Sequence, residues 1–352
     1  MPINVASIAS ITVESLNKVP GVEAKGFFVN RHKYHYPSKN SFYFEGISRK
    51  RRPHRWLKQE IERFFLFKKL YNWADIIHWV YDDAGLKNRE KKLIRKLYKP
   101  SVIEWVGSDI RNPEKLFAVN PYYNKAFKNG YEYAHYESES QSFSNQQKFF
   151  EYGSVPLVNP EMDIYLEKRL FPKRYYIAHK LFLDEFIPQY PDVTNQRPLI
   201  LHSPTAQFAK GSNFILPIIE ELKKEYDFDF RLLQNMPREE VLSLMRQCDI
   251  FIDQVIIGMH GLASSEAMAF GKPVLCYLMP EIFKNGFSGN CPIVNASVDT
   301  LRAELINLIT DPQLRYKTGV ASRQYAEENF DAVENAKGLV SIYKEVIKDY
   351  KK

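Results

Sequence analysis

The chain has 352 residues, of which 45% are hydrophobic and 26% are charged, a composition that excludes wholesale disorder. This length is too great for one compact core and predicts two domains of about 150–200 residues each. The net charge of +7 indicates an anionic partner, and nucleic acid, an acidic membrane surface and a phosphate-bearing substrate all fit that requirement.

No part of the sequence has the character of a membrane span or a secretion signal. Apolar runs stay well short of the roughly 20 residues that cross a bilayer, and no charged segment followed by an apolar one opens the chain. The three cysteines, Cys248, Cys276 and Cys291, have no paired spacing, which argues against a disulfide scaffold and a zinc site. We therefore expect a cytoplasmic protein with reduced cysteines.

The first half of the chain alternates strands and helices, with long polar insertions between them. The residue patterns predict a helix over 3–17, a strand over 21–30, a basic helix over 55–73, a strand over 76–80, a helix over 88–98 and a strand over 102–106. No convincing strand precedes the first helix, because too few residues stand before it. Prolines and aromatic residues concentrate between 170 and 197, which is the best candidate for a connection between domains.

The second half alternates more regularly. It predicts strands over 198–202, 228–233, 249–254 and 273–278, helices over 212–226, 238–248 and 264–270, and three closing helices over 300–310, 312–328 and 332–350. Strands of this length alternating with helices are typical of a parallel, doubly wound sheet. Such sheets bind ligands in the crevice outside the carboxyl ends of their strands.

The strongest motif runs from 258 to 274. A loop with two glycines leads into a helix that begins near Ser264 or Ser265, both favourable N-cap residues. Free N–H groups and the positive end of the helix dipole suit a phosphate there. Glu266, one turn into the helix, can accept hydrogen bonds from two ribose hydroxyls. Gly271 then closes the helix.

This motif resembles the donor-site signature of glycosyltransferase family 4, the group 1 glycosyltransferases of GT-B fold. The resemblance covers about 198–350 and rests on Glu266-Ala267-Met268-Ala269, Gly271-Lys272-Pro273-Val274, Lys210-Gly211 and the closing helices after Asp311. It implies an α/β protein in which two Rossmann-like domains, each with a doubly wound parallel sheet, face a cleft. The implied domains are an acceptor domain over 1–175, a nucleotide-sugar domain over 176–330, and a C-terminal helix over 331–352 that returns to the N-terminal domain.

The resemblance also implies residue roles. Glu266 corresponds to the second Glu of a Glu-x7-Glu pair, which holds the ribose, while Gly258 stands where the first is expected. Lys210 corresponds to the lysine that neutralises the diphosphate leaving group, and Thr205 replaces its companion arginine. The residues expected to bind the donor are Ser203, Thr205, Lys210, His260, Gly261, Leu262, Ala263, Ser264, Ser265 and Glu266.

A second motif follows the strand over 102–106, where Trp105 leads into Gly-Ser-Asp. It resembles the Trp-x-Gly-Ser-Asp-x-Arg element of a bacterial subset of these enzymes. Asp109 is a candidate catalytic residue beside Lys210, and the candidate acceptor contacts are His78, Ser108, Asp109 and Arg111. The alternative for Asp109 is a turn-stabilising role. His202, like His78, stands at the end of a predicted strand, and for both histidines the alternative to a functional role is a structural one.

Clustered cations over 49–58 lead into an aromatic run that extends to 69. This pattern fits an anionic membrane surface or a polyprenyl-diphosphate acceptor. The alternative is a solvated basic helix whose aromatic face packs on the core. No nucleic-acid module accompanies the cations, so nucleic acid is not expected as a partner.

The expected function is that of a retaining glycosyltransferase, with retention implied by the resemblance alone. It would move a sugar from a nucleotide sugar to a glycan or lipid-linked acceptor in bacterial surface polysaccharide synthesis, in the cytoplasm or at the inner face of the cell membrane. Asp227 and Asp229 have Asp-x-Asp spacing but open a strand, so no metal and no other cofactor is expected. The alternatives are a non-catalytic GT-B-like scaffold that binds a nucleotide or glycan, and a sugar-nucleotide epimerase.

Overall fold

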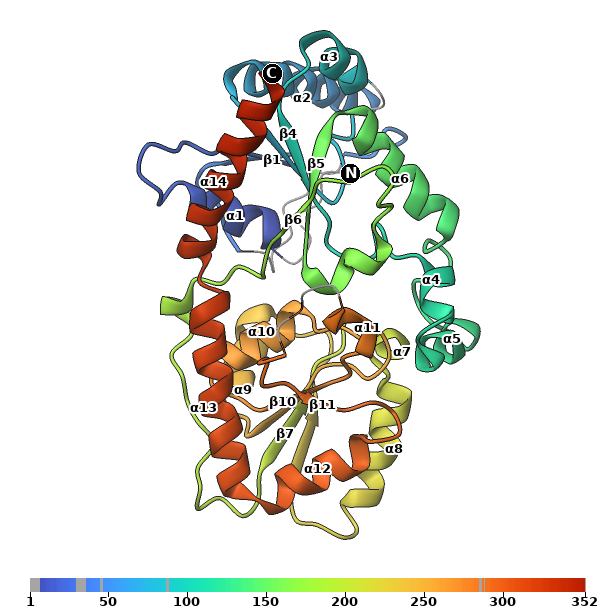
Figure 1. Cartoon of the computed structure of the whole chain (residues 1–352), viewed down its shortest axis with the longest axis vertical. Helices are drawn as coiled ribbons and strands as arrows, with labels where there is room; N and C mark the ends of the chain where they lie inside the picture. Colours follow the sequence, from blue (N-terminus) through green and yellow to red (C-terminus); the bar gives the residue numbers. More distant parts are fainter. Residues whose placement is uncertain are drawn as a thin grey trace.

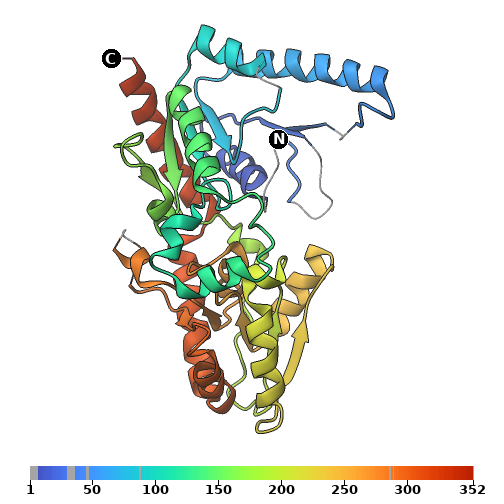
Figure 2. The same cartoon turned by 90° about the vertical axis from the view of Figure 1, so that its right-hand side faces the viewer.

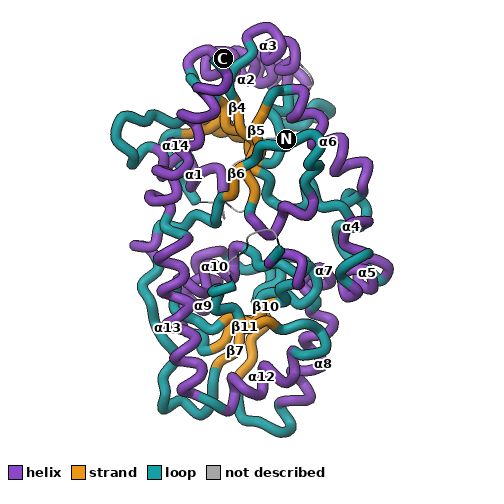
Figure 3. The backbone as a smooth tube through the Cα atoms, in the orientation of Figure 1, coloured by secondary structure: helices purple, strands orange, loops and turns teal. Residues whose placement is uncertain are grey.

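The structure is a computed structural model of the chain, and it describes residues 7–29, 36–44, 47–86, 89–284, 287 and 289–351. Two parallel sheets lie one above the other along the long axis, with helices around each of them (Figure 1, Figure 3). Every pair of named strands is parallel. The α/β class that the sequence predicts is therefore confirmed.

The N-terminal sheet has the strand order β3-β4-β5-β6, and β1 and β2 form a separate pair near it. The strands are β1 (Gly26–Val29), β2 (Ser41–Phe44), β3 (Ile77–Val80), β4 (Ser101–Glu104), β5 (Ser154–Val158) and β6 (Tyr175–Tyr176). The helices are α1 (Ile8–Leu16), α2 (Pro53–Trp73), α3 (Arg89–Leu97), α4 (Pro113–Phe117), α5 (Pro121–Lys128) and α6 (Glu139–Glu151), with 3-10 helices η2 (Pro160–Tyr165) and η3 (Leu183–Glu185). All four residues of β4 are buried, as expected for a central parallel strand covered on both faces.

The C-terminal sheet has the order β11-β10-β9-β7-β8. Its strands are β7 (Leu199–His202), β8 (Asp229–Leu232), β9 (Ile250–Ile252), β10 (Val274–Cys276) and β11 (Val294–Asn295). The helices are α7 (Gln207–Lys210), α8 (Ser212–Leu222), α9 (Arg238–Gln247), α10 (Leu262–Ala269), α11 (Pro280–Phe283), α12 (Leu301–Thr310), α13 (Pro312–Asn329) and α14 (Ala332–Tyr350). Helix α14 leaves this sheet and runs along α1 and β4 beside the N-terminal sheet (Figure 1).

Most elements that the sequence predicts are present with shifted ends. The predicted helix over 3–17, strand over 21–30 and helix over 88–98 correspond to α1, β1 and α3, and their predicted residues 3–6, 30 and 88 lie outside the described residues. The sequence did not predict the helices α4, α5, α6, α7 and α11 or the strands β2, β5, β6 and β11. Three of these helices begin where Asn112, Asn120 and Ser138 accept hydrogen bonds from first-turn N–H groups, which is a local signal for a helix start.

One shifted boundary lies at the predicted phosphate site. Helix α10 begins at Leu262, with Gly261 as its N-cap, so Ser264 and Ser265 lie inside it. The reason is that the Gly261 carbonyl accepts hydrogen bonds from the N–H groups of Ser264 and Ser265, at 3.0 and 3.4 Å. The predicted end is correct: Gly271 has φ +75, and the following N–H returns to the Ala267 carbonyl.

Candidate active site

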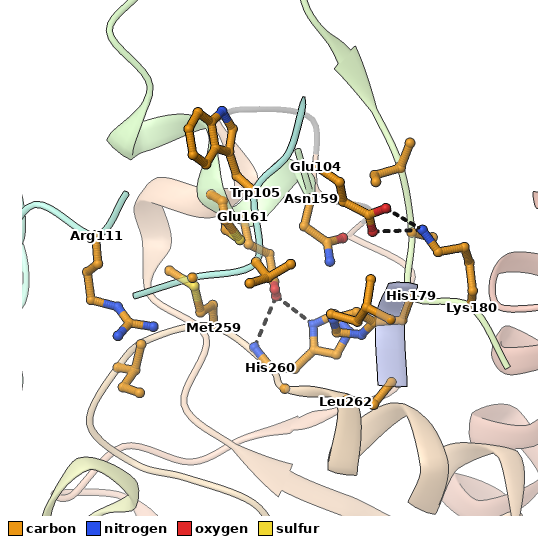
Figure 4. Close-up of a pocket in the computed structure, with 18 of the residues that line it drawn as sticks. Glu104, Trp105, Arg111, Asn159, Glu161, His179, Lys180, Met259, His260 and Leu262 are labelled. Atoms are coloured by element: carbon orange, nitrogen blue, oxygen red, sulfur yellow. Dashed lines mark hydrogen bonds and ion pairs between the residues drawn. The ribbon is translucent and has the colours of Figure 1, made fainter. Parts of the chain in front are cut away.

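A cavity of about 190 Å³ lies between the two sheets (Figure 4). Its upper wall comes from the loops that follow β4 and β5 and from the segment after β6. Its lower wall comes from Lys210 and from the loop between β9 and α10. Because these loops follow the carboxyl ends of parallel strands, the cavity occupies the crevice where such sheets bind ligands. The labelled lining residues are Glu104, Trp105, Arg111, Asn159, Glu161, His179, Lys180, Met259, His260 and Leu262.

Lys210 and Asp253 form an ion pair at the lower wall. Asp253 directly follows β9, and its carboxylate also accepts the Ser264 hydroxyl at 2.6 Å and the Gly261 N–H at 3.0 Å. Burial alone would raise the pKa of Asp253, but Lys210 and these hydrogen bonds lower it to about 2. The pair therefore holds the Lys210 ammonium beside the first turn of α10, where the sequence predicts a phosphate site.

Glu161 on η2 and His260 on the loop before α10 join the two walls. The Glu161 carboxylate accepts the His260 N–H at 3.2 Å and lies 2.6 Å from its Nδ1 (Figure 4). Burial would lower the pKa of His260, but Glu161 raises it above the ordinary value. Nε2 of His260 is buried and has no hydrogen-bond partner among the described residues. Since an unsatisfied buried polar atom is costly, this nitrogen is suited to contact a ligand.

His179 lies beside His260, with ring centroids 5.0 Å apart. Its Nδ1 is 2.7 Å from the Ser265 hydroxyl, so the second serine of the motif contacts the segment after β6. Burial lowers the pKa of His179 to about 3, and this ring is therefore neutral near pH 7. A neutral imidazole can accept or donate a hydrogen bond without adding charge to the cavity.

Glu104 and Lys180 form a buried ion pair of the upper wall, with Nζ 2.7 and 2.8 Å from the two carboxylate oxygens (Figure 4). The same carboxylate lies 3.1 Å from Nε2 of His78, whose Nδ1 is 2.5 Å from the Tyr343 hydroxyl on α14. The network thus connects the cavity to the C-terminal helix. His78 lines a different cavity, beside β1 and β3, and is not among the residues that line the cavity between the two sheets, so this geometry favours the structural alternative for His78.

The Asp109 side chain makes its hydrogen bonds within its own loop. Its carboxylate accepts the N–H groups of Val106, Gly107 and Ile110, at 2.7 to 3.2 Å. Burial raises the pKa of Asp109 to about 7, although these donors act in the opposite direction. This geometry favours the turn-stabilising alternative over contact with a substrate. Ser108 lies near the Tyr81 hydroxyl, whose pKa burial raises and Ser108 acts to lower.

Arg111 lines the cavity and is held by an ion pair with the buried Glu137. Glu137 also accepts the hydroxyls of Tyr123 and Tyr131, at 2.8 and 3.1 Å. The guanidinium is therefore fixed from the side away from the cavity.

Glu266 pairs with Arg238 of α9 and does not line the cavity between the sheets. Burial raises its pKa, and Arg238 acts in the opposite direction. Ser203 is half-buried and Thr205 is exposed in the loop after β7, outside that cavity. Gly258 has φ +86, and a Cβ there would meet Met279 at 3.0 Å, so the local backbone disfavours the glutamate that the family pattern places at this position.

His202 has a structural role. Its Nδ1 lies 2.9 Å from the Ile252 carbonyl and its Nε2 lies 2.8 Å from the Ser212 hydroxyl. Burial lowers the pKa of His202 to about 4, so the ring links β7, β9 and α8 as a neutral group.

Helices α4 and α5 form an arm that extends beside the C-terminal sheet (Figure 1, Figure 2). The Asn120 amide donates to the Ile256 carbonyl at 2.8 Å, and the Tyr122 hydroxyl donates to Asp299 at 2.6 Å. Beyond α5, the Glu132 carboxylate accepts the N–H groups of Phe208 and Ala209, at 2.8 Å each. The arm therefore holds α7 and the cavity loop, and with them Lys210.

The sequence reasoning missed Glu104, Glu161, His179, Lys180 and Asp253. Glu104 and Asp253 carried a usable signal, because each is a carboxylate at the carboxyl end of an apolar strand. Glu161, His179 and Lys180 lie in irregular segments, and no periodicity marks them.

Gly211 offers a test of the local geometry around Lys210. Its φ is +80, and an added Cβ would lie 2.5 Å from Val255 and 2.9 Å from Ile256. We expect Gly211→Ala to lower the free energy of unfolding by roughly 2–4 kcal/mol through left-handed strain and overpacking. Gly338→Ala is the matched control, because Gly338 is inside α14 with no atom near an added Cβ, and it should stabilise by about 0.5–1 kcal/mol. Urea denaturation measures both, and equal effects would contradict the geometry.

Residues 206–325 match the sequence model of the family described as glycosyl transferases group 1. No curated protein matches the chain. Among solved structures, sucrose-phosphate synthase from Thermosynechococcus elongatus is similar over 96% of this chain and 92% of its own, with TM-score 0.66 and 15% identity. The Anabaena protein HepE, in complex with UDP-glucose, is similar over 97% and 96%, with TM-score 0.57 and 11% identity. A protein from Listeria monocytogenes described as a UDP-N-acetylglucosamine 2-epimerase is similar over 95% and 91%, with TM-score 0.50 and 11% identity.

Proposed function

Since residues 206–325 form a group 1 glycosyl transferase domain within a GT-B fold, we propose that this chain transfers a sugar from a nucleotide sugar to a glycan or lipid-linked acceptor. The observation that carries the proposal is the cavity between the sheets, with Lys210 beside the first turn of α10. We further propose retention of configuration, a role in bacterial surface polysaccharide synthesis, and a cytoplasmic location.

In the proposed reaction, the nucleoside diphosphate lies against Lys210 and the start of α10. Of the N–H groups there, that of Gly261 donates to Asp253, and those of Ser264 and Ser265 donate to Gly261. The N–H groups of Leu262 and Ala263 are the ones we assign to the phosphate. They supply positive charge where the departing β-phosphate gains negative charge.

The bond between the sugar's anomeric carbon and the β-phosphate oxygen breaks, and the acceptor oxygen bonds to the same carbon from the same face. The acceptor proton passes to the departing phosphate. Nε2 of His260 is assigned to a sugar hydroxyl, because it is buried without a hydrogen-bond partner among the described residues. Arg111 is assigned to the acceptor side, because it lines the cavity from the wall opposite His260. No metal takes part in this scheme.

We assign Glu266 to the ribose. Its carboxylate pairs with Arg238, so a bound ribose must either share the Glu266 carboxylate with the Arg238 guanidinium or displace that guanidinium. The domain division that accompanies this scheme is an acceptor domain over 1–175, a donor domain over 176–330 and a returning helix over 331–352.

Helix α2 supports a further proposal, contact with an anionic membrane. Phe67 and Tyr71 pack on the core, but Leu57, Ile61 and Phe65 are 50%, 46% and 62% exposed at a spacing of four. Lys58 follows Leu57, and Lys68 and Lys69 stand one turn after Phe65 in the same helix. The contact we propose is peripheral, with the exposed stripe of α2 lying on the membrane surface. None of the described helices has the length and apolar character to cross a bilayer. We expect Leu57→Ser/Ile61→Ser/Phe65→Ser to reduce flotation with phosphatidylglycerol vesicles at least about tenfold, and an unchanged bound fraction would contradict it.

The test of the function is a panel of nucleotide sugars followed by turnover. We expect one nucleotide sugar to raise the melting temperature, because a ligand that binds only the folded state stabilises it. The same compound should then be consumed when a glycan or polyprenyl-phosphate acceptor is added. Stabilisation by none of the panel would contradict the proposal.

A binding module without catalysis is the second candidate. Lys210, Glu266, Arg111 and Lys180 each have an oppositely charged partner within the chain, which favours a site already neutral without a substrate. Binding of a nucleotide sugar with no turnover against a broad acceptor panel would favour this candidate.

A further inference from the structure

The Glu161 carboxylate reaches from one wall of the candidate cavity to His260 on the other (Figure 4). Glu161 lies on η2 and is 1% exposed, and His260 lies in the loop before α10 and is 6% exposed. One carboxylate oxygen, Oε1, accepts the backbone N–H of His260 at 3.2 Å and lies 2.6 Å from Nδ1 of its ring. Both the backbone and the ring of His260 are therefore held by a residue of the opposite wall.

Aromatic rings pack around the His260 imidazole. The Phe330 ring is stacked on it with centroids 6.1 Å apart, and the Phe287 and His179 rings have centroids 5.7 and 5.0 Å away. His179 is held in turn, with Nδ1 2.7 Å from the Ser265 hydroxyl. A ring packed in this way has little room to rotate. The group that His260 presents to a ligand is therefore decided by which of its nitrogens carries the proton.

The contact with Glu161 decides the position of that proton. A carboxylate accepts hydrogen bonds and donates none, so Nδ1 of His260 must be the donor. In the neutral ring Nε2 then accepts a hydrogen bond, and in the charged ring it donates one. Nε2 is buried and has no partner in the part of the chain that the structure describes. A sugar hydroxyl suits both forms of the ring, because it can donate and accept.

We infer that Glu161 is the positioning residue of the donor-sugar site: it holds a proton on Nδ1 of His260 and so presents Nε2 to the transferred sugar. The inference rests on the proposed function, which places a sugar hydroxyl at Nε2. The groups proposed to hold the diphosphate, Lys210 and the first turn of α10, both belong to the lower wall. The lower wall therefore binds the nucleoside diphosphate, whereas the contact with the sugar also needs a residue of the upper wall.

The charges around His260 agree with this role. Burial lowers the pKa of His260, but Glu161 raises it above the ordinary value. Asp253 acts in the same direction as Glu161, and Lys210, which is paired with Asp253, acts in the opposite one. His179 is neutral near pH 7, because burial lowers its pKa to about 3. Without Glu161, burial would be the largest influence, and the pKa of His260 should fall below its ordinary value.

The first test observes the imidazole directly and needs no substrate. Histidine labelled with a nitrogen isotope is introduced, and the His260 signals, identified by their loss in His260→Gln, are followed by NMR as the pH is varied. In the unchanged chain we expect the proton on Nδ1 of the neutral ring and a pKa above 6.5. In Glu161→Ala the proton should no longer be confined to Nδ1, and the pKa should fall below 6.5. In Glu161→Gln the amide oxygen still accepts from Nδ1, so the proton should stay there while the pKa falls.

The second test separates the sugar from the nucleotide. Calorimetry measures the affinity for the nucleotide sugar that stabilises the chain and, separately, for its nucleoside diphosphate. We expect Glu161→Ala to weaken binding of the nucleotide sugar at least about tenfold and to leave that of the nucleoside diphosphate within about twofold. Glu161→Gln should regain most of the lost affinity. Glu151→Ala is the matched control and should change neither affinity, because Glu151 forms an exposed ion pair with Arg95 in the same half of the chain.

A proton on Nε2 of the neutral ring in the unchanged chain, or an unchanged Nδ1 signal in Glu161→Ala, would overturn the inference. An equal loss of affinity for the nucleotide sugar and the nucleoside diphosphate would also overturn it, because Glu161 would then act on the fold alone. If Glu161→Ala does not fold, an unchanged His260 pKa in Glu161→Gln would overturn it. If no nucleotide sugar binds the unchanged chain, the proposed function fails together with the sugar contact, and the NMR comparison still decides whether Glu161 holds the proton on Nδ1.

Discussion

Lys210→Ala is expected to lower kcat by about 100- to 1,000-fold, with a much smaller change in KM. The ammonium lines the candidate cavity, and its charge is proposed to act on the leaving diphosphate, whose negative charge is greatest in the transition state. Steady-state transfer with the nucleotide sugar identified by the panel measures both constants. A parallel rise in KM with unchanged kcat would contradict the role in leaving-group stabilisation.

Lys210→Ala also lowers the stability of the fold, and this effect must be measured separately from the effect on catalysis. It leaves the buried carboxylate of Asp253 without its cation, which destabilises by about 3–5 kcal/mol. Lys210→Met/Asp253→Asn removes both charges and keeps a hydrogen-bonding group for Ser264 and Gly261. We expect this double variant to regain most of the lost stability while transfer stays low.

Lys223→Ala is the matched control, because Lys223 forms an exposed ion pair with Glu220 on the surface of α8 and its neighbouring turn. Its stability and its transfer rate should both stay near those of the unchanged chain. Recovery of transfer in the Lys210/Asp253 double variant would show that the chemistry does not need the ammonium.

The sequence correctly predicted those parts of the secondary structure that depend on residues close to one another along the chain. The carboxyl end of α10 is an example, since Gly271 adopts the left-handed conformation that its position after an apolar helix predicts. The parallel sheets and the closing helices followed from periodicity in the same way. The start of α10 could not be predicted from N-cap preference, because Gly261 takes the cap position and Ser264 donates instead to Asp253.

The site depends on pairings that are distant in sequence, and local patterns carry no information about them. Glu161 meets His260 across 99 positions, and Lys180 meets Glu104 across 76. His78 is the second residue of β3 (Ile77–Val80), and the direction of its side chain depends on Tyr343 of the last helix. A polar residue near the end of a predicted strand can therefore lie close to the site, but the sequence does not predict on which face of the sheet its side chain lies.

Glu104→Ala is expected to lower the free energy of unfolding by about 3–5 kcal/mol, because it leaves Lys180 buried without a counter-charge. It also removes the group that lies against Nε2 of His78. Glu104→Gln/Lys180→Met should regain much of the loss. Glu23→Ala is the control, since Glu23 pairs with Lys25 on the surface and its removal should change stability by less than about 1 kcal/mol. A loss no larger for Glu104→Ala than for Glu23→Ala would contradict the buried network.

The ion pair between Glu104 and Lys180 also predicts how the free energy of unfolding of the unchanged chain depends on pH. Burial alone would raise the pKa of Glu104, but Lys180 and His78 lower it from 4.5 to about 2. Because the folded pKa is the lower one, the stabilisation is fully present above about pH 4.5 and is lost as the pH falls toward 2. Burial also lowers the pKa of His78 from 6.5, so its contribution begins to fall below about pH 6.5. Urea denaturation between pH 7 and pH 3 measures this dependence. The unchanged chain should lose stability more steeply with falling pH than Glu104→Gln/Lys180→Met. Equal slopes would show that Lys180 and His78 do not hold the Glu104 carboxylate ionised.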